Sequence, residues 1–244
     1  MATTAKTALI TGAGSGIGRG IAEALDGIGL RIALLGRDPA KLEQTRAGLS
    51  QTGGTALVAP CDVADRAQVG ATVAAVLAEF GSIDVLVCNA GTNVRNRSLE
   101  TLEPADWDRM IATNLTGAFN LVHEVLPSMR ARQSGLIVQI DSVSGKRVSV
   151  LGGVGYSASK FGQAALGVGI GREEGSRGIR STVIYPGEVN TPILDARPVP
   201  VGRERREVIL QPADLGAAVR FLVELHPRAS VPELVIKPTV DDFF

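Results

Sequence analysis

The chain alternates short, nearly continuous apolar runs with longer amphipathic stretches, and this alternation restricts its fold more than any other feature. A strand that is apolar throughout is buried on both faces, which is typical of a parallel sheet whose strands are connected by helices. We therefore predict one α/β domain over residues 1–244, with a doubly wound parallel sheet of seven strands and helices on both faces. The runs are residues 7–11, 31–36, 55–61, 83–88, 135–140, 180–186 and 233–238.

Composition excludes several other classes of protein. The 25 basic side chains balance 25 acidic ones, so no net charge favours nucleic acid or an anionic membrane as a partner. The first residues lack the apolar stretch of a secretory signal, and no apolar run is long enough to span a membrane. The two cysteines and two histidines do not have the spacing of a disulfide framework or a metal site. We expect a cytoplasmic protein without a metal that acts on a small molecule.

A glycine-rich turn, TGAGSGIGRG at residues 11–20, follows the first predicted strand. Its glycines fit the spacing GxxxGxG and not GxGxxG, because the residues are Gly12, Gly16 and Gly18. Glycines allow a tight turn and the close approach of a pyrophosphate, and the following helix directs free N–H groups toward that anion. The turn predicts a dinucleotide site in a Rossmann-type fold.

A tyrosine and a lysine stand four residues apart in the segment GYSASKFG at residues 155–162. On a helix, Tyr156 and Lys160 would share one face, with only small residues between them. Tyrosine has an ordinary pKa of about 10, and a nearby ammonium would favour the phenolate and lower that pKa. Alone, such a pair is more often an ordinary part of a buried helix.

Together, TGAGSGIG, the segment NAG at 89–91, a serine after the fifth strand and YSASK at 156–160 resemble the short-chain dehydrogenase/reductase family. The motifs occur in the family's order, and the resemblance covers essentially the whole chain. It implies a catalytic tetrad with a tyrosine as general acid/base, a serine that polarises the substrate carbonyl and an asparagine that holds a water linking the lysine to solvent. The tetrad is Asn114, Ser142, Tyr156 and Lys160.

The serine assignment leaves an alternative and an unexplained neighbour. Ser142 and Ser144 are both candidates, and Ser142 with Gly145 fits the family's Ser-x-x-Gly pattern. Asp141 stands where many members have another serine, and the sequence offers no account of that change.

The end of the second strand predicts which nicotinamide cofactor is used. Gly36 carries no charge, and Arg37 offers a guanidinium for the 2′-phosphate of NADP(H). Asp38 is better explained as a helix N-cap before Pro39. Arg37 could instead be a solvated surface residue, and Ser15 stands where many NADP-preferring members have a basic residue.

The resemblance assigns the remaining cofactor contacts. Asp62 and Val63 would hold the adenine, residues 89–91 would lie beside the ribose, and the segment 186–191 would contact the nicotinamide amide. Lys160 would also hold the hydroxyls of the nicotinamide ribose. The predicted cofactor residues are Gly12, Ser15, Gly16, Ile17, Gly18, Arg37, Asp62, Val63, Asn89, Ala90, Gly91, Tyr156, Lys160, Pro186, Gly187, Val189 and Thr191.

These observations predict an NADP(H)-dependent oxidoreductase that interconverts an alcohol and a ketone or aldehyde. The alternative is a non-catalytic NADP-binding redox sensor or scaffold with the same fold. Two features favour a 3-hydroxy acid or a related small carbonyl as substrate: the basic residues Arg95, Arg97, Lys146 and Arg147, and an ending at 230–239 similar to 3-hydroxy acid and serine dehydrogenases. We expect an irregular substrate lid at about 187–211. From the resemblance and the apolar ending at 241–244, we expect a homo-oligomer, either a tetramer or a dimer.

Overall fold

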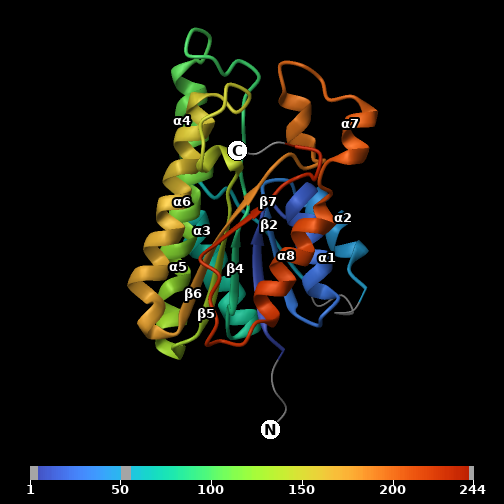
Figure 1. Cartoon of the computed structure of the whole chain (residues 1–244). Coiled ribbons are helices and arrows are strands. Elements are labelled where there is room, and N and C mark those ends of the chain that lie inside the picture. The colour runs from blue at the N-terminus through green and yellow to red at the C-terminus, as the bar shows by residue number, and fades with distance from the viewer. Residues whose placement is uncertain (1–4, 51–55, 242–244) are drawn as a thin grey trace.

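The computed structural model describes residues 5–50 and 56–241 (Figure 1). It confirms the predicted Rossmann-type α/β fold, because seven parallel strands form one sheet in the order β3-β2-β1-β4-β5-β6-β7. The predicted strands match the observed ones to within two residues at each end. The strands are β1 (Thr7–Thr11), β2 (Arg31–Gly36), β3 (Leu57–Pro60), β4 (Val85–Cys88), β5 (Gly135–Ile140), β6 (Ile179–Pro186) and β7 (Glu233–Ile236).

The strand order changes direction at β1, and this position determines where a ligand can bind. β1 pairs with β2 on one side and with β4 on the other. Loops leaving such neighbouring strands run to opposite faces of the sheet, so a crevice opens beyond their carboxyl ends. The glycine turn follows β1 and the segment NAG follows β4, so both lie at this crevice.

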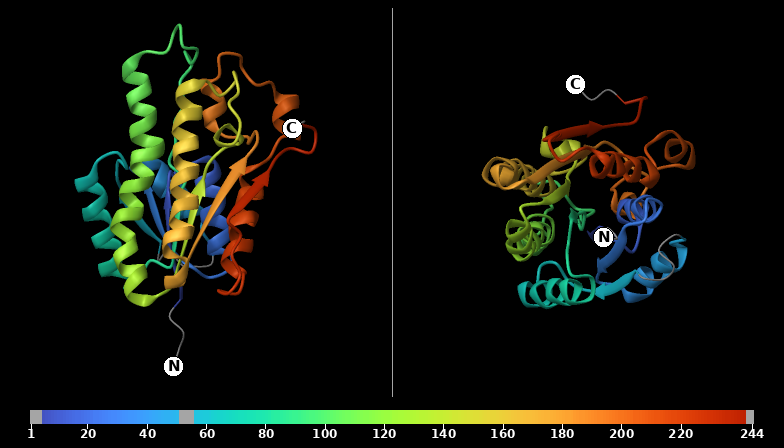
Figure 2. Two further views of the ribbon diagram at one scale, coloured as in Figure 1. Left: turned by 60° about the vertical axis from the view of Figure 1, so that its left-hand side comes forward. Right: turned by 90° about the horizontal axis from the view of Figure 1, so that it is seen from below.

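Helices cover both faces of the sheet (Figure 2). On one face, α1 (Gly16–Asp26), α2 (Pro39–Gly48) and α8 (Pro212–Glu224) pack apolar side chains against the strands. On the other face lie α3 (Arg66–Phe80), α5 (Gly117–Arg132) and α6 (Val154–Glu174). No helix in the described part of the chain is long and apolar enough to cross a membrane.

Local sequence signals explain where several helices begin. The Asp38 carboxylate accepts hydrogen bonds from the N–H groups of Ala40 and Lys41, so the predicted N-cap of α2 is confirmed. Asp65 caps α3 in the same way. α8 begins with a proline after a capping box between Gln211 and Asp214.

The segment 187–211 stands beyond the carboxyl ends of the strands, where α7 is labelled in Figure 1. The expectation that it is irregular was wrong in part, because it contains a 3₁₀-helix (Pro192–Ala196) and α7 (Arg203–Val208). Its two ends meet through a parallel bridge between Val189 and Leu210. The apolar ending that was predicted to favour association lies mostly outside the described residues.

Candidate active site

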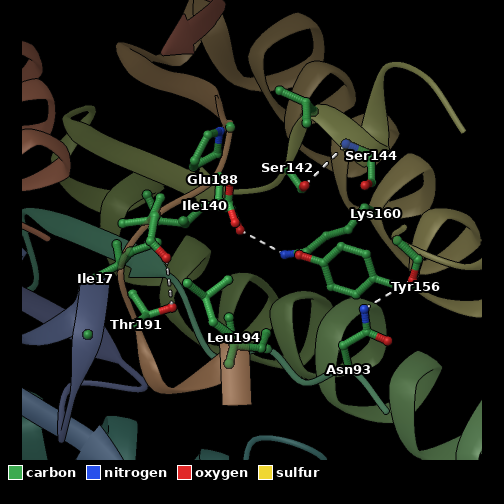
Figure 3. Close-up of a pocket in the computed structure, with 18 of the residues that line it drawn as sticks. Ile17, Asn93, Ile140, Ser142, Ser144, Tyr156, Lys160, Glu188, Thr191 and Leu194 are labelled. Atoms are coloured by element: carbon green, nitrogen blue, oxygen red, sulfur yellow. Dashed lines mark hydrogen bonds between the residues drawn. The ribbon is translucent and has the colours of Figure 1, made fainter. Parts of the chain in front are cut away.

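A cavity of about 750 Å³ opens at the carboxyl edge of the sheet, where the strand order reverses (Figure 3). Its walls come from the glycine turn, the ends of β4 and β5, the start of α6 and the segment 186–197. The structure thus brings together motifs that are far apart in the chain. The predicted site residues that line it are Gly12, Ser15, Gly16, Ile17, Asn89, Ala90, Gly91, Ser142, Tyr156, Lys160, Pro186, Gly187, Val189 and Thr191.

Five predicted residues lie outside the cavity wall. Gly18 packs beneath the glycine turn, and Asn114 is fully buried in a helix behind the wall. Arg37 is exposed after β2. Asp62 accepts a hydrogen bond from the N–H of Ala64, which makes it a turn residue, and Val63 packs against Gly117. Arg37, Asp62 and Val63 nevertheless follow β2 and β3 at the same edge of the sheet as the cavity.

The glycine turn has the conformation that its sequence requires. Gly12 and Gly16 have φ values of +63° and +51°, which side chains other than glycine rarely adopt. A Cβ atom at Gly18 would lie 2.4 Å from the carbonyl oxygen of Gly12. No side chain caps the first turn of α1, so its backbone N–H groups remain available to an anion.

Asn89 holds the end of β4 to the end of β1. Its amide nitrogen donates a hydrogen bond to the carbonyl oxygen of Thr11 at 2.8 Å. In return, the Thr11 hydroxyl accepts from the backbone N–H groups of Asn89 and Ala90. These contacts fix the floor of the cavity between the two strands.

Tyr156 and Lys160 lie on the same face of α6, as expected, and both reach the cavity (Figure 3). Lys160 is buried, and its ammonium donates to the carbonyl oxygen of Ile140 at 2.9 Å and to Gln163 at 2.7 Å. It lies 5.7 Å from the centroid of the Tyr156 ring. Burial lowers the pKa of this lysine, while the charge of Asp141 opposes that shift.

The prediction that the environment lowers the pKa of Tyr156 was wrong in this structure. Desolvation of the phenol raises its pKa to about 12, and the negative charge of Asp141 acts in the same direction. Hydrogen bonding to Ser142 and the positive charge of Arg97 oppose the shift but do not outweigh it. A phenol with a high pKa is protonated at neutral pH, so Tyr156 carries its proton there.

The two candidate serines occupy different positions after β5. Ser142 caps a 3₁₀-helix (Val143–Gly145), where its hydroxyl accepts from the N–H of Ser144 at 3.1 Å. The same hydroxyl interacts with Tyr156. Ser144 faces Gly152 instead, since a Cβ atom added at Gly152 would lie 2.7 Å from the Ser144 hydroxyl. The geometry therefore favours Ser142 as the partner of Tyr156.

Asn114 lies in a π-helix (Ile111–Thr116) between α4 (Pro104–Met110) and α5. Its side chain accepts from the N–H of Thr92 and donates to the Thr92 carbonyl and to Ser159. A Cβ at Gly91 would lie 3.6 Å from the Asn114 side-chain oxygen and 3.8 Å from the Lys160 nitrogen. Gly91 thus separates the two polar groups without a side chain that would block the space between them.

The four basic residues that favour an acidic substrate in the sequence, Arg95, Arg97, Lys146 and Arg147, do not lie together. Lys146 pairs with Glu233 at 2.8 Å and lies over the Tyr185 ring, outside the cavity wall. Arg95 and Arg147 are exposed and also lie outside it. Arg97 alone of the four lines the cavity, where it is buried. Only Arg97 is therefore placed to contact a ligand in the cavity.

Several residues of the cavity wall were not predicted. Glu188 is paired with Arg197 and Arg205, and Arg205 is also paired with Asp241. These ion pairs join the segment after β6 to the C-terminal segment. No periodic pattern in residues 187–211 indicated them, and only the charge run at 203–207 marked the region as unusual.

Comparisons with known proteins agree with this site. A model of the short chain dehydrogenase family matches residues 6–199. A Streptomyces violaceoruber protein named for ketoacyl reduction in the granaticin polyketide synthase is 42% identical over 198 residues, 79% of this chain and 71% of that protein. A variant of actinorhodin polyketide ketoreductase, solved with NADPH, matches with a TM-score of 0.87 and 32% identity over 97% of each chain. Serine dehydrogenase in a closed form with NADP⁺ matches with a TM-score of 0.88 and 27% identity, over 97% of this chain and 96% of that one.

Proposed function

The chain belongs to the short-chain dehydrogenase/reductase family, and we propose that it is an NADP(H)-dependent oxidoreductase that interconverts a small ketone or aldehyde with the corresponding alcohol. The observation that carries this proposal is the meeting of Tyr156, Lys160 and Ser142 with the glycine turn in one cavity. A sensor or scaffold would not need an acid and a carbonyl-polarising hydroxyl at the end of a dinucleotide cleft.

The residues present fit a dinucleotide. The positions of Gly12, Gly16 and Gly18 leave space that a Cβ would fill, and the uncapped start of α1 suits a pyrophosphate. Gly36 and exposed Arg37 stand where a 2′-phosphate would be recognised. When bound, the nicotinamide supplies or accepts the hydride. The chain itself supplies binding, orientation and the proton.

Tyr156 donates the proton to the carbonyl oxygen during reduction and removes it from the alcohol during oxidation. Ser142 donates a hydrogen bond to the same oxygen and polarises the carbonyl. Lys160 orients the ribose hydroxyls and supplies a positive charge behind the phenol. Asn114, across Gly91 from Lys160, supports a proton path from the buried lysine toward solvent.

We further propose a small 3-oxo acid, reduced to a 3-hydroxy acid, as the substrate class. Arg97 lines the cavity near Tyr156, and it donates to the carbonyl oxygens of Val94, Leu151 and Ala196. A guanidinium has five N–H groups, so two have no acceptor among the described residues. Burial and the charge of Arg197 lower the pKa of Arg97, which means that an anionic partner would stabilise its charged form. A substrate carboxylate would supply that partner.

A spectrophotometric assay tests the activity. We expect loss of NADPH absorbance with members of a panel of aldehydes, ketones and 3-oxo acids, and no loss without a carbonyl. Tight NADPH binding without turnover of any of them would favour the sensor or scaffold instead.

The Arg97→Gln variant tests the substrate class. We expect wild-type enzyme to prefer a 3-oxo acid to its methyl ester in kcat/KM, and the variant to lose about ten- to a hundredfold of that preference, as for a charge-assisted hydrogen bond. The acid-to-ester ratio is measured within one variant, so a general loss of folding cancels. Arg95→Gln, which changes an exposed arginine outside the cavity, is the matched control and should keep the preference. An unchanged ratio in Arg97→Gln would reject the carboxylate contact.

We also propose that the segment 187–211 closes over the substrate, and that the enzyme is a cytoplasmic homo-oligomer, either a tetramer or a dimer. Phe119 on α5 and Phe161 on α6 are 42% and 43% exposed, which is costly for phenylalanine in water. Light scattering at micromolar concentration should give a multiple of the chain mass, and Phe161→Glu should shift the distribution toward smaller species. A monomer mass for the wild type would contradict this.

A further inference from the structure

The side chain of Asp141 is a buried acid that the proposed reaction does not use directly. It follows β5 immediately, is 4% exposed, and lines the cavity beside Ser142. One carboxyl oxygen, Oδ1, accepts from the backbone N–H of Ser142 at 2.6 Å. The other, Oδ2, is buried and has no hydrogen-bond partner among the described residues. An unsatisfied buried carboxyl oxygen is costly and calls for an explanation.

The chain is shaped around this carboxyl group. A Cβ at Gly145 would lie 2.0 Å from Oδ1 of Asp141 and 3.1 Å from the backbone oxygen of Lys160. Any side chain at position 145 would therefore displace the carboxyl group from its place between the 3₁₀-helix and α6. Gly145, the glycine of the Ser-x-x-Gly pattern, thus makes room for Asp141.

Charged and titratable groups face Asp141 from several elements. Tyr156 and Lys160 face it from α6, Lys146 from the loop after the 3₁₀-helix, and Tyr185 from β6. Both lysines among them are engaged elsewhere, because Lys146 pairs with Glu233 and Lys160 donates to Ile140 and Gln163. Asp141 is thus the negative charge that acts on the Tyr156 phenol from within the cavity wall.

We propose that the carboxylate of Asp141 is a positioning residue that keeps the Tyr156 hydroxyl protonated, so that carbonyl reduction continues to higher pH than it would without this charge. The carboxylate acts through electrostatic repulsion of a phenolate and through its hold on the Ser142 backbone, and it does not touch the substrate. This inference rests on the proposed function of Tyr156 as the proton donor.

The ionisation of Asp141 itself is consistent with this role. Burial raises its pKa to about 7, while Lys160, the Ser142 N–H and Lys146 oppose the rise. It is therefore ionised in the alkaline range where Tyr156 loses its proton. Below neutral pH the carboxyl becomes neutral, and its repulsion of a phenolate disappears.

The pH profiles of Asp141→Asn test the proposal. Asparagine keeps an oxygen that can accept from the Ser142 N–H, but it removes the charge. With saturating cofactor, the alkaline fall of carbonyl reduction and the alkaline rise of alcohol oxidation should both move to lower pH by about one to two units. Asp141→Ser should move both limbs in the same direction if asparagine impairs folding. Glu79→Gln, which removes an exposed negative charge at the end of α3, should move neither.

A second readout does not depend on turnover. The chain has two tyrosines, so Tyr185→Phe leaves Tyr156 as the one tyrosine whose ionisation changes the ultraviolet absorbance. Read immediately after a jump to alkaline pH, the midpoint should fall when Asp141→Asn is added to that background. Equal midpoints together with unchanged pH profiles would overturn the inference. The wild type could lack carbonyl turnover while the midpoint still falls when Asp141→Asn is added to Tyr185→Phe. That result would count against the proposed function and leave the role of Asp141 intact.

Unfolding measurements test the ionisation of Asp141 separately. An acid whose pKa is raised by folding stabilises the native state below its ordinary pKa and loses that contribution as the pH rises through about 7. As the pH rises from 5 to 8, about the range in which the carboxyl becomes charged, the free energy of unfolding of Asp141→Asn should therefore increase relative to that of wild type. The same difference at both pH values would show that the carboxyl does not titrate in this range and would contradict a pKa of about 7 for Asp141.

Discussion

The Tyr156→Phe enzyme is expected to bind NADPH nearly as well as wild type but to turn over at least about a hundredfold more slowly, because a general acid contributes about 10²–10⁴-fold. The substitution removes one hydroxyl and keeps the ring that lies against Lys160. Cofactor affinity is measured by fluorescence titration, and kcat by the loss of NADPH absorbance with a carbonyl substrate.

Tyr185→Phe is a matched control for this result. Its hydroxyl is bonded to Glu233 and lies outside the cavity wall, so we expect turnover near that of wild type. Lys160→Ala should instead impair both cofactor binding and turnover, since the proposed roles of the lysine include both. Near-normal turnover in Tyr156→Phe would reject the tyrosine as the proton donor.

Local patterns in the sequence were sufficient to predict the strands and much of the site. The apolar runs determine strands that are buried on both faces, and Asp38 before Pro39 determines the start of α2 because capping depends on neighbouring residues only. The glycine turn and the helix position of Tyr156 and Lys160 are local in the same sense. Their meeting in one cavity follows from the strand order, in which β1 lies between β2 and β4.

Features that depend on long-range packing could not be predicted. The pKa of Tyr156 is raised by desolvation, which depends on how α6 packs against β5 and not on the four-residue spacing from Lys160. Lys146 was expected near the substrate, but Glu233 on β7, far along the chain, holds it elsewhere. The space that Asp141 occupies depends on Gly145 and on the backbone of α6 at Lys160, which is distant in the chain.

Replacing Arg37 with alanine is expected to lower kcat/KM for NADPH by about tenfold and to leave NADH almost unchanged. A charge-assisted hydrogen bond to phosphate is worth about 1.5–3 kcal/mol, equivalent to about ten- to a hundredfold. We expect the lower end, because Arg37 is exposed and Ser15 adds no second positive charge. Raising the salt concentration should weaken NADPH binding more than NADH binding, since only NADPH uses this charge pair.

Gly36→Asp should reverse the cofactor preference, because a carboxylate at the end of β2 would repel the 2′-phosphate and accept from the free ribose hydroxyl of NADH. A Cβ at Gly36 would lie 3.3 Å from the Cδ2 atom of Leu42, so this buried side chain must shift slightly to admit it. Gly36→Ala is the matched control, which adds the same Cβ without the charge and should keep the order of the two cofactors. Asp38 caps α2 through Oδ1, and its Oδ2 lies 3.6 Å from the ammonium of Lys41. If the wild type preferred NADH, or if Arg37→Ala weakened both cofactors equally, Arg37 would be a surface residue and Asp38 would have to be reconsidered as the ribose ligand.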